Sequence, residues 1–448
     1  MKTKLRIAVL AGLASLIAGP MPSGTCVAQQ PPPVRLTLQD AIRKGLEAHL
    51  SVLVGGTRVD EAEGTRERRL SAALLPRVSA QTFANVQNRD LRAFGISAPG
   101  FPDVVGPFSN YDFRIYAQQN IVDLQSYRGL RASERALDAS KMDLQDARDL
   151  MVRAIAALYL NAQSAAARVD AAHSRVTDSN ALLKLAKDKH DAGSATGVDV
   201  LRAQVQLAND RQAELVAENQ LKQSLLALAR NLGMSPGTPL ELAEPLVYRT
   251  LNGLDPATLA PASLLSRADY LSLDRQRQGL IEQQRANHAR FYPKLSINGN
   301  FGAIGRSIGG VQPTGLIQGQ IDFTVFDRDG EAQELASRVK CIDDQIADLR
   351  RGIDEDIREA LLNLDSAAEQ VTVAGEGLGF AKRELELAQD RFQIGTANNV
   401  EVVTAQDELA RAQENYILAV SSHVDAKFAL ARAMGDTEKN FVQFMGNP

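Results

Sequence analysis

Two long stretches of the chain carry hydrophobic residues at coiled-coil spacing. In the stretch from about 124 to 190, they recur every seven positions: Leu130, Leu137, Leu144, Met151 and Leu158. In the stretch from about 329 to 393, the same spacing gives Leu335, Ile342 and Leu349. Such a seam favours long packed helices rather than the stripe of a globular helix. At about 1.5 Å per residue, the first stretch predicts a helix about 100 Å long.

The chain also repeats itself. Residues 227–233 read ALARNLG, and residues 429–435 read ALARAMG, 202 positions later. Each long stretch ends at a break that contains glycine, at 192–197 and at 394–398, and a return helix follows it. A period of this length is too long for a solenoid unit and indicates one duplicated module. We therefore predict a mostly α fold with two internal repeats, each with a long antiparallel helical hairpin.

Each half contains two strand-like segments before its long helix. Their bounds are 77–86 and 111–122 in the first half, and 294–302 and 316–326 in the second. Apolar and polar residues alternate along them, as in Leu295, Ile297, Gly299 and Phe301 against Lys294, Ser296, Asn298 and Asn300. In addition, 13 of the 22 Phe and Tyr residues lie within 83–127 and 291–326. This pattern is typical of membrane-barrel strands with aromatic girdles.

Four strands from one chain cannot close a barrel, so the membrane interpretation requires several copies. An open lumen needs about 12 strands, which predicts three chains around one axis. The alternative is a water-soluble sheet packed on the helices, and the pattern alone leaves both open.

Shorter helices and the chain termini complete the predicted organisation. Thr37 is expected to cap a helix through Leu50, and a second helix should stop at Pro76. The predicted divisions are a signal peptide at 1–28, a first repeat at 29–235, a Pro-rich linker at 236–262, a second repeat at 263–435 and a tail at 436–448. The second repeat should open with a helix near Ser263 and another over 272–292.

The N-terminus has the pattern of a secretory signal. Lys2, Lys4 and Arg6 precede an apolar run over 7–18, and cleavage is expected after Ala28. In a rival interpretation Cys26 is a lipidated N-terminus, although its flanking residues fit that motif poorly. Removing the signal leaves 47 basic against 54 acidic residues, a net charge of −7. With no basic block, nucleic acid is not an expected partner.

No catalytic, cofactor or metal site is predicted. The five histidines are scattered without metal-ligand spacing. Asp327 and Asp329 look like a fragment of a calcium loop, but capping of the following helix by Asp329 and Glu331 explains them better. We therefore expect no enzyme.

With these features the chain resembles the TolC-type outer-membrane efflux proteins over nearly its whole mature length. The motifs that carry the resemblance are LTLQDAI at 36–42, LLP at 74–76, YP at 292–293, FDRDG at 326–330 and the two hairpin tips at 193–204 and 395–406. The family implies a homotrimer with a 12-stranded barrel in outer-membrane lipid and an α-helical tunnel through the periplasm. It also implies two partners, a periplasmic adaptor (membrane fusion) protein and an inner-membrane efflux pump or ABC exporter.

Family members close the periplasmic end of the pore with charged residues after the second tip. The best-known member has an arginine and two acids there, where this chain has Ala397, Glu401 and Thr404. The resemblance therefore makes Glu401 a candidate gate residue, together with Asp407 one turn or more beyond it and Asp199 in the first repeat. Three copies of Glu401 around one axis would repel one another and bind cations. The alternative is that Glu401 and Asp199 merely favour the first turn of a helix.

The hairpin tips are the expected docking surface for the adaptor. Gly193 and Gly395 should permit the left-handed turn between antiparallel helices, which is also a purely structural role. Four valines beside these glycines are predicted to be exposed for docking: Val198, Val200, Val400 and Val402. The resulting hypothesis is a passive exit duct whose cargo the sequence does not identify. Its rival is a soluble periplasmic coiled-coil scaffold or adaptor.

Overall fold

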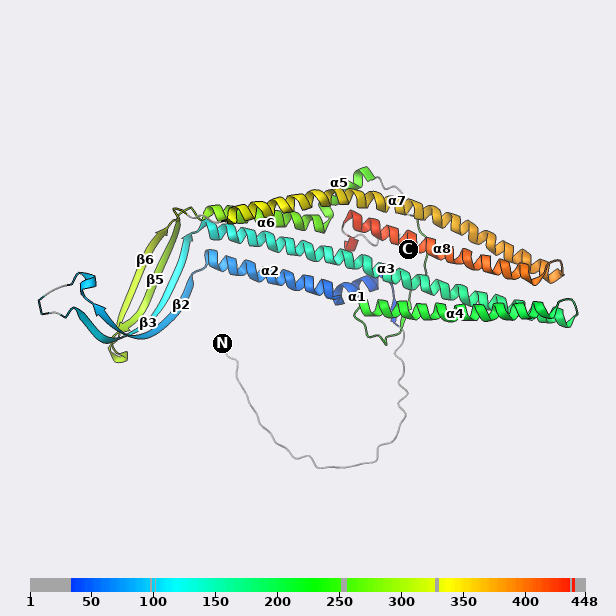
Figure 1. The fold of residues 1–448 in the computed structure, drawn as a ribbon, viewed down its shortest axis with the longest axis horizontal. Helices are drawn as coiled ribbons and strands as arrows, with labels where there is room; N and C mark the ends of the chain where they lie inside the picture. Colours follow the sequence, from blue (N-terminus) through cyan, green and yellow to red (C-terminus); the bar gives the residue numbers. More distant parts are fainter. Residues whose placement is uncertain are drawn as a thin grey trace, which may run out of the picture.

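The computed structural model of the chain describes residues 34–96, 99–100, 102–250, 256–326, 330–435 and 437–439. The predicted signal peptide with Cys26, the capping residue Asp329 and most of the predicted tail lie outside the described residues. Within the described part, the molecule is long and narrow, with a β-sheet at one end and two helical hairpin tips at the other (Figure 1).

The helices follow the predicted order in both halves. The first half has α1 (Leu38–Ala48), α2 (Leu50–Leu74), α3 (Leu124–Asp191) and α4 (Gly197–Asn231). The second half has α5 (Pro256–Ser266), α6 (Ala268–Ala289), α7 (Glu331–Ile394) and α8 (Asn399–Met434). As predicted, the Thr37 side chain caps α1 by accepting a hydrogen bond from the backbone N–H of Asp40 at 3.1 Å. Helix α6 begins four residues earlier than expected, at Ala268.

The heptad residues predicted for α3 are at its packed face. Leu130, Leu137 and Met151 are buried, and Leu144 and Leu158 pack against the central core. That core lies halfway along the molecule and joins α1, α3 and the ends of α4 and α8. In it the fully buried Tyr159 hydroxyl donates a 3.0 Å hydrogen bond to the carbonyl of Leu36, which satisfies a polar group that has left water.

The four long strands form one antiparallel sheet in the order β2-β3-β5-β6. Their bounds are β2 Arg77–Asp90, β3 Val104–Val122, β5 Lys294–Gly305 and β6 Gln312–Asp322. The first hairpin is longer than predicted, because pairing continues past a bulge near Gln87 to the pair Asp90 and Val104. The last strand ends earlier, at Asp322, because its partner there is Lys294, and the preceding Pro293 has no N–H to extend the ladder.

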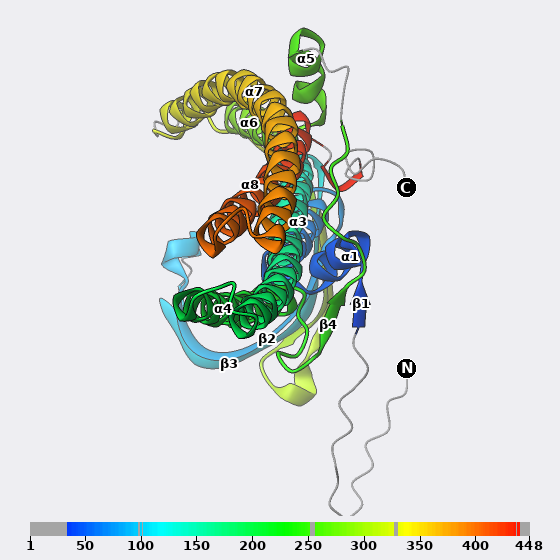
Figure 2. The same ribbon diagram turned by 90° about the vertical axis from the view of Figure 1, so that its right-hand side faces the viewer.

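The sequence analysis missed a short parallel strand pair, one strand of which lies in the Pro-rich linker. β1 (Val34–Leu36) pairs with β4 (Leu240–Leu242) beside α1. Segments of three residues are too short to show alternation, so the sequence pattern gave no signal for them. In the end-on view, these strands, α1 and α5 lie on the convex side of a curved layer whose two ends are α4 and α7 (Figure 2). The helical hairpins thus form an arc with an open concave side.

Candidate functional site at the hairpin tips and the sheet

The two hairpin tips are built around glycine. Gly193 has φ of +74° and Gly395 has φ of +82°, a left-handed conformation that side chains other than glycine rarely adopt. The predicted conformational role of both residues is therefore confirmed. Their role in docking a partner is a separate prediction.

Asp199 is engaged in starting helix α4. Its Oδ2 accepts hydrogen bonds from the Thr196 backbone N–H at 2.9 Å and from the Thr196 hydroxyl at 2.7 Å. The first of these bonds belongs to a capping box at the start of α4. Both bonds hold the pKa of Asp199 below its ordinary value, with the hydroxyl bond as the larger cause. The carboxylate thus has the local helix-start role that the sequence offered as the alternative to a gate.

Glu401 is paired across the second tip. It lies in the first turn of α8, and its Oε2 is 3.2 Å from the Arg391 Nη1 in the last turn of α7. Sequence reasoning sought an arginine at Ala397 and missed Arg391. The available signal was a basic residue in the last helical turn, where it suits the helix dipole.

The tips of the two hairpins are also joined to each other. The side-chain amide of the fully buried Asn399 donates a 2.8 Å hydrogen bond to the carbonyl of Asp199. Asp199 and Glu401 are therefore held near one another by the first turns of α4 and α8. Asp407 is not part of this group. It is exposed further along α8, where it borders a small cavity between the hairpins.

The four valines at the tips differ in exposure. Val198 and Val400 are 53% and 42% exposed, as the docking hypothesis requires, whereas Val200 is half-buried. The prediction that Val402 is exposed is wrong, because its side chain is 0% exposed. It lies on the face of α8 that packs with Leu385 and Phe392 of α7. Two other large apolar residues are more exposed at the tips and were missed: Leu201 at 61% and Ile394 at 73%.

Opposite faces of the sheet have opposite polarity. Cross-strand pairing places one set of mostly apolar side chains on a common face: Val78, Ala80, Val86, Tyr111, Phe113, Ile115, Ile297, Phe301, Ile317 and Ile321. On the other face, Arg114 donates hydrogen bonds to the buried Asp112 at 2.7 Å and to Asn300 at 3.4 Å. Asn298 donates to Gln320 there at 3.1 Å. The alternation read from the sequence therefore produces one mostly apolar face.

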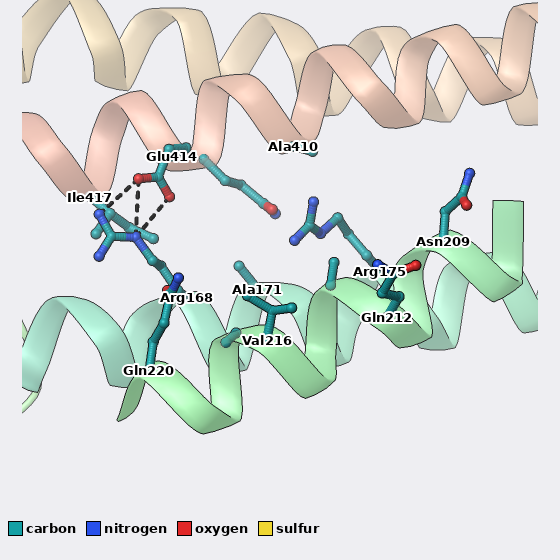
Figure 3. A pocket seen from close by; sticks show the side chains of 13 residues that line it. Arg168, Ala171, Arg175, Asn209, Gln212, Val216, Gln220, Ala410, Glu414 and Ile417 are labelled. Atoms are coloured by element: carbon teal, nitrogen blue, oxygen red, sulfur yellow. Dashed lines mark hydrogen bonds and ion pairs between the residues drawn. The ribbon is translucent and has the colours of Figure 1, made fainter. Parts of the chain in front are cut away.

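A groove of about 440 Å³ separates α4 from α8 on the tip side of the molecule. Figure 3 shows Arg168 of α3 bound to Glu414 of α8 at one end and the Arg175 side chain within the groove. The Arg168–Glu414 contact is bidentate, with distances of 2.8 to 3.0 Å. The hydrogen bonds that the Arg168 guanidinium donates to Glu414 raise the pKa of Arg168. This ion pair ties the first hairpin to the second.

The described part of the chain contains neither a metal-binding cluster nor a helix that could span a membrane. Its His, Cys, Asp and Glu residues form no group of three that could hold a metal ion. No helix over the same residues is both long and apolar enough to cross a membrane.

Comparison with known proteins identifies the family. The family model of outer membrane efflux proteins matches residues 42–234 and 262–436. The chain is 22% identical to the pyoverdine export outer membrane protein OpmQ of Pseudomonas aeruginosa, covering 81% of this chain and 78% of OpmQ. It is also 22% identical to the toluene efflux pump outer membrane protein TtgC of Pseudomonas putida, covering 89% of this chain and 82% of TtgC.

A solved structure has the same fold. The outer membrane protein VceC of Vibrio cholerae superposes with a TM-score of 0.75 at 18% identity, covering 89% of this chain and 96% of VceC. The family match spans most of both repeats, so the chain belongs to the outer membrane efflux protein family and is an outer-membrane protein with a long periplasmic helical portion.

Proposed function

We propose that three copies of this chain form a passive exit duct across the outer membrane and periplasm. The observation that carries the proposal is the mostly apolar face of the four-stranded sheet, placed at one end of helices of 64 and 68 residues. An apolar face on strands with a polar opposite face suits lipid outside and a wet lumen inside. Family membership favours this duct over a soluble periplasmic scaffold.

Both edges of the sheet and both ends of the helical arc support a ring of copies. Within the described chain, β2 and β6 each pair on one side only. Exposed apolar residues lie along α4 (Val205, Leu215 and Leu226) and along α7 (Leu362, Val373, Phe380 and Leu387). Because α4 and α7 are opposite ends of the arc (Figure 2), α4 of one copy can pack against α7 of the next copy. Such a head-to-tail contact closes into a ring when the rotation allows it.

The tips supply the proposed contacts with an adaptor, and an inner-membrane pump or exporter would supply the energy. Val198 and Val400, flanked by Leu201 and Ile394, are the exposed apolar groups available there. The cargo named for OpmQ and TtgC differs between the two, pyoverdine and toluene, so we assign no cargo to this chain.

The test is single-channel conductance of the purified mature chain in planar bilayers, with oligomer mass measured on the same sample. The proposal predicts a complex of three chains with discrete, cation-preferring conductance steps. A monomer or dimer that never inserts would contradict it and favour the scaffold.

The same experiment tests the proposed gate. In a trimer, three Arg391–Glu401 pairs would lie around the axis, and the acids would attract cations. Glu401→Gln should therefore lower cation preference and change conductance. Glu408→Gln is the matched control, because Glu408 is exposed on the same helix and pairs with Arg411 three residues on. A Glu401→Gln channel identical to wild type would rule out the acidic ring.

A further inference from the structure

Helix α8 presents a row of amides to the first hairpin. Asn399, Gln406 and Gln413 are seven residues apart. Asn399 contacts α4, Gln406 borders a cavity shared with α3 and α4, and Gln413 lies in the groove beside Arg168 and Arg175. Seven-residue spacing keeps side chains on one face of packed helices. The contact between the two hairpins therefore includes polar groups in positions where coiled coils usually have apolar ones.

The middle amide has no hydrogen-bond partner. Gln406 is only 6% exposed, and neither its Nε2 nor its Oε1 has a partner among the described residues. Burying both atoms of an amide without partners is costly. The side chain borders a cavity of about 10 Å³, which is about the volume of a single water. A group in that space is needed to satisfy the amide.

The cavity is rich in carboxylates. It is bordered by Asp178 and Ser179 of α3, by Gln206 and Asp210 of α4, and by Gln406 and Asp407 of α8. Asp210 is buried and accepts a hydrogen bond from the Ser179 hydroxyl. The Gln206 amide lies 3.4 Å from the same carboxylate. Asp210 thus already accepts hydrogen bonds from Ser179 and Gln206, whereas its neighbour Asp178 takes no part in that network.

The charges that face the cavity come from three of its four helices. Helix α3 contributes Asp178 and Arg175, α4 contributes Asp210 and α8 contributes the exposed Asp407, while α7 contributes only Leu385. Three carboxylates against one guanidinium leave an excess of negative charge. The volume is too small for a hydrated cation, and no metal-binding group of three exists among the described residues. A proton is the positive charge that fits.

We propose that this cavity is a proton-binding site that joins the two hairpins of one chain. A proton taken from solvent binds the Asp178 carboxylate, whose O–H then donates to the Gln406 Oε1 and holds α8 against α3. When the proton leaves, this hydrogen bond is lost and the contact between α3 and α8 loosens. Because the site lies within one chain, the inference does not depend on the duct proposal.

The direction of the effect follows from the environment of Asp178. Burial, followed by the negative charge of Asp210, raises its pKa above the ordinary value. A carboxyl with a raised pKa binds its proton more tightly in the folded state than in the unfolded state. The hairpin contact therefore gains stability as the pH falls through the raised pKa toward about 4, the ordinary aspartate value.

Hydrogen–deuterium exchange of the full mature chain in detergent tests this site without requiring transport. Exchange rates, divided by the intrinsic rates at each pH, are compared at about pH 5 and pH 7.5 for peptides covering 170–185 and 400–415. The wild-type contact should be roughly three- to tenfold better protected at the lower pH. Asp178→Asn should show the same protection at both pH values, close to the acid level.

Two further variants make the outcome decisive. Asp188→Asn changes an exposed aspartate on the same helix and should keep the wild-type pH difference. Gln406→Leu removes the acceptor and fills the position with an apolar group of similar size, so it should reduce the difference over 400–415 while the hairpins stay packed. The proposal is overturned if Asp178→Asn or Gln406→Leu retains the wild-type pH response, or if Asp188→Asn loses it. If Asp178→Asn does not fold, the Gln406→Leu result decides.

Discussion

Helix α8 meets its neighbours through two sets of residues of different chemistry. Val402, Ala405 and Leu409 belong to an apolar core that contains residues of α7 and also of α3 and α4 in the first hairpin. Asn399, Gln406 and Gln413 form a polar row toward the first hairpin, with Glu414 bound to Arg168. Apolar packing is insensitive to pH and salt, whereas hydrogen bonds and ion pairs respond to both. The comparison teaches that apolar packing holds the two hairpins together near the tips, while the polar contacts between them respond to pH and salt.

The largest expected effect is in the apolar core. Leu409→Ala should lower the free energy of unfolding by about 2–5 kcal/mol, because it removes buried methyl groups and leaves a cavity. Thermal denaturation of the purified protein measures the loss. Leu418→Ala is the control, because Leu418 is 46% exposed on the same helix and should change little. Equal effects of the two variants would break the distinction between the two sets.

An intermediate effect is expected where the first turn of α4 is capped. Asp199→Ala removes the capping box and should cost about 1 kcal/mol locally, seen as faster amide exchange over 197–205. Because the pKa of Asp199 is lowered in the folded state, this stabilisation is present above the ordinary value of about 4 and is lost as the pH falls through the lowered pKa.

The response to acid should thus be opposite at the tip and at the Asp178 cavity. Asp191→Ala, at an 82% exposed side chain just before the first tip, is the control for the capping effect. Tip exchange that stays constant down to pH 3 would contradict the assigned role of Asp199.

The smallest expected effect belongs to the ion pair between hairpins. Because Arg168 and Glu414 are 25% and 43% exposed, their coupling energy should be only about 0.5–1 kcal/mol. A double-mutant cycle with Arg168→Met and Glu414→Gln measures it, and the coupling should fall as salt is raised. A coupling that is unaffected by salt would show that this contact behaves like the apolar core.

Most of the helical architecture could be predicted from the sequence, because long seams repeat one signal many times. The heptad leucines of α3, the proline stops and the two strand pairs all left such signals. Strands β1 and β4 did not, because three residues carry no period. Val402 was misassigned for a different reason. A valine in a first helical turn is apolar whichever way it points, and its burial depends on how α7 crosses α8.

The candidate site was less predictable because it depends on partners distant in sequence. Asp199 and Glu401 were found as acids, but Asp199 proved to be a cap and Glu401 proved to be paired with Arg391 across a turn. Residues of α3, α4 and α8 line the cavity around Gln406, and no local sequence pattern predicts that they come together. Such sites depend on the register in which the helices pack against one another. That register is set by packing between distant segments and is not visible in a local stretch of sequence.

The short strand pair β1–β4 lies beside the core at the middle of the molecule. It ties the segment before α1 to the linker beside the central core, and the linker carbonyl of Glu244 accepts a 2.8 Å hydrogen bond from Gln163 of α3. From there α4 and α8 extend over 35 and 36 residues toward the tips, about 50 Å each. At that length, a rotation of the helices by about 5° at the central core would move a tip by about 4 Å. Small rearrangements at the core are therefore magnified where the hairpins end.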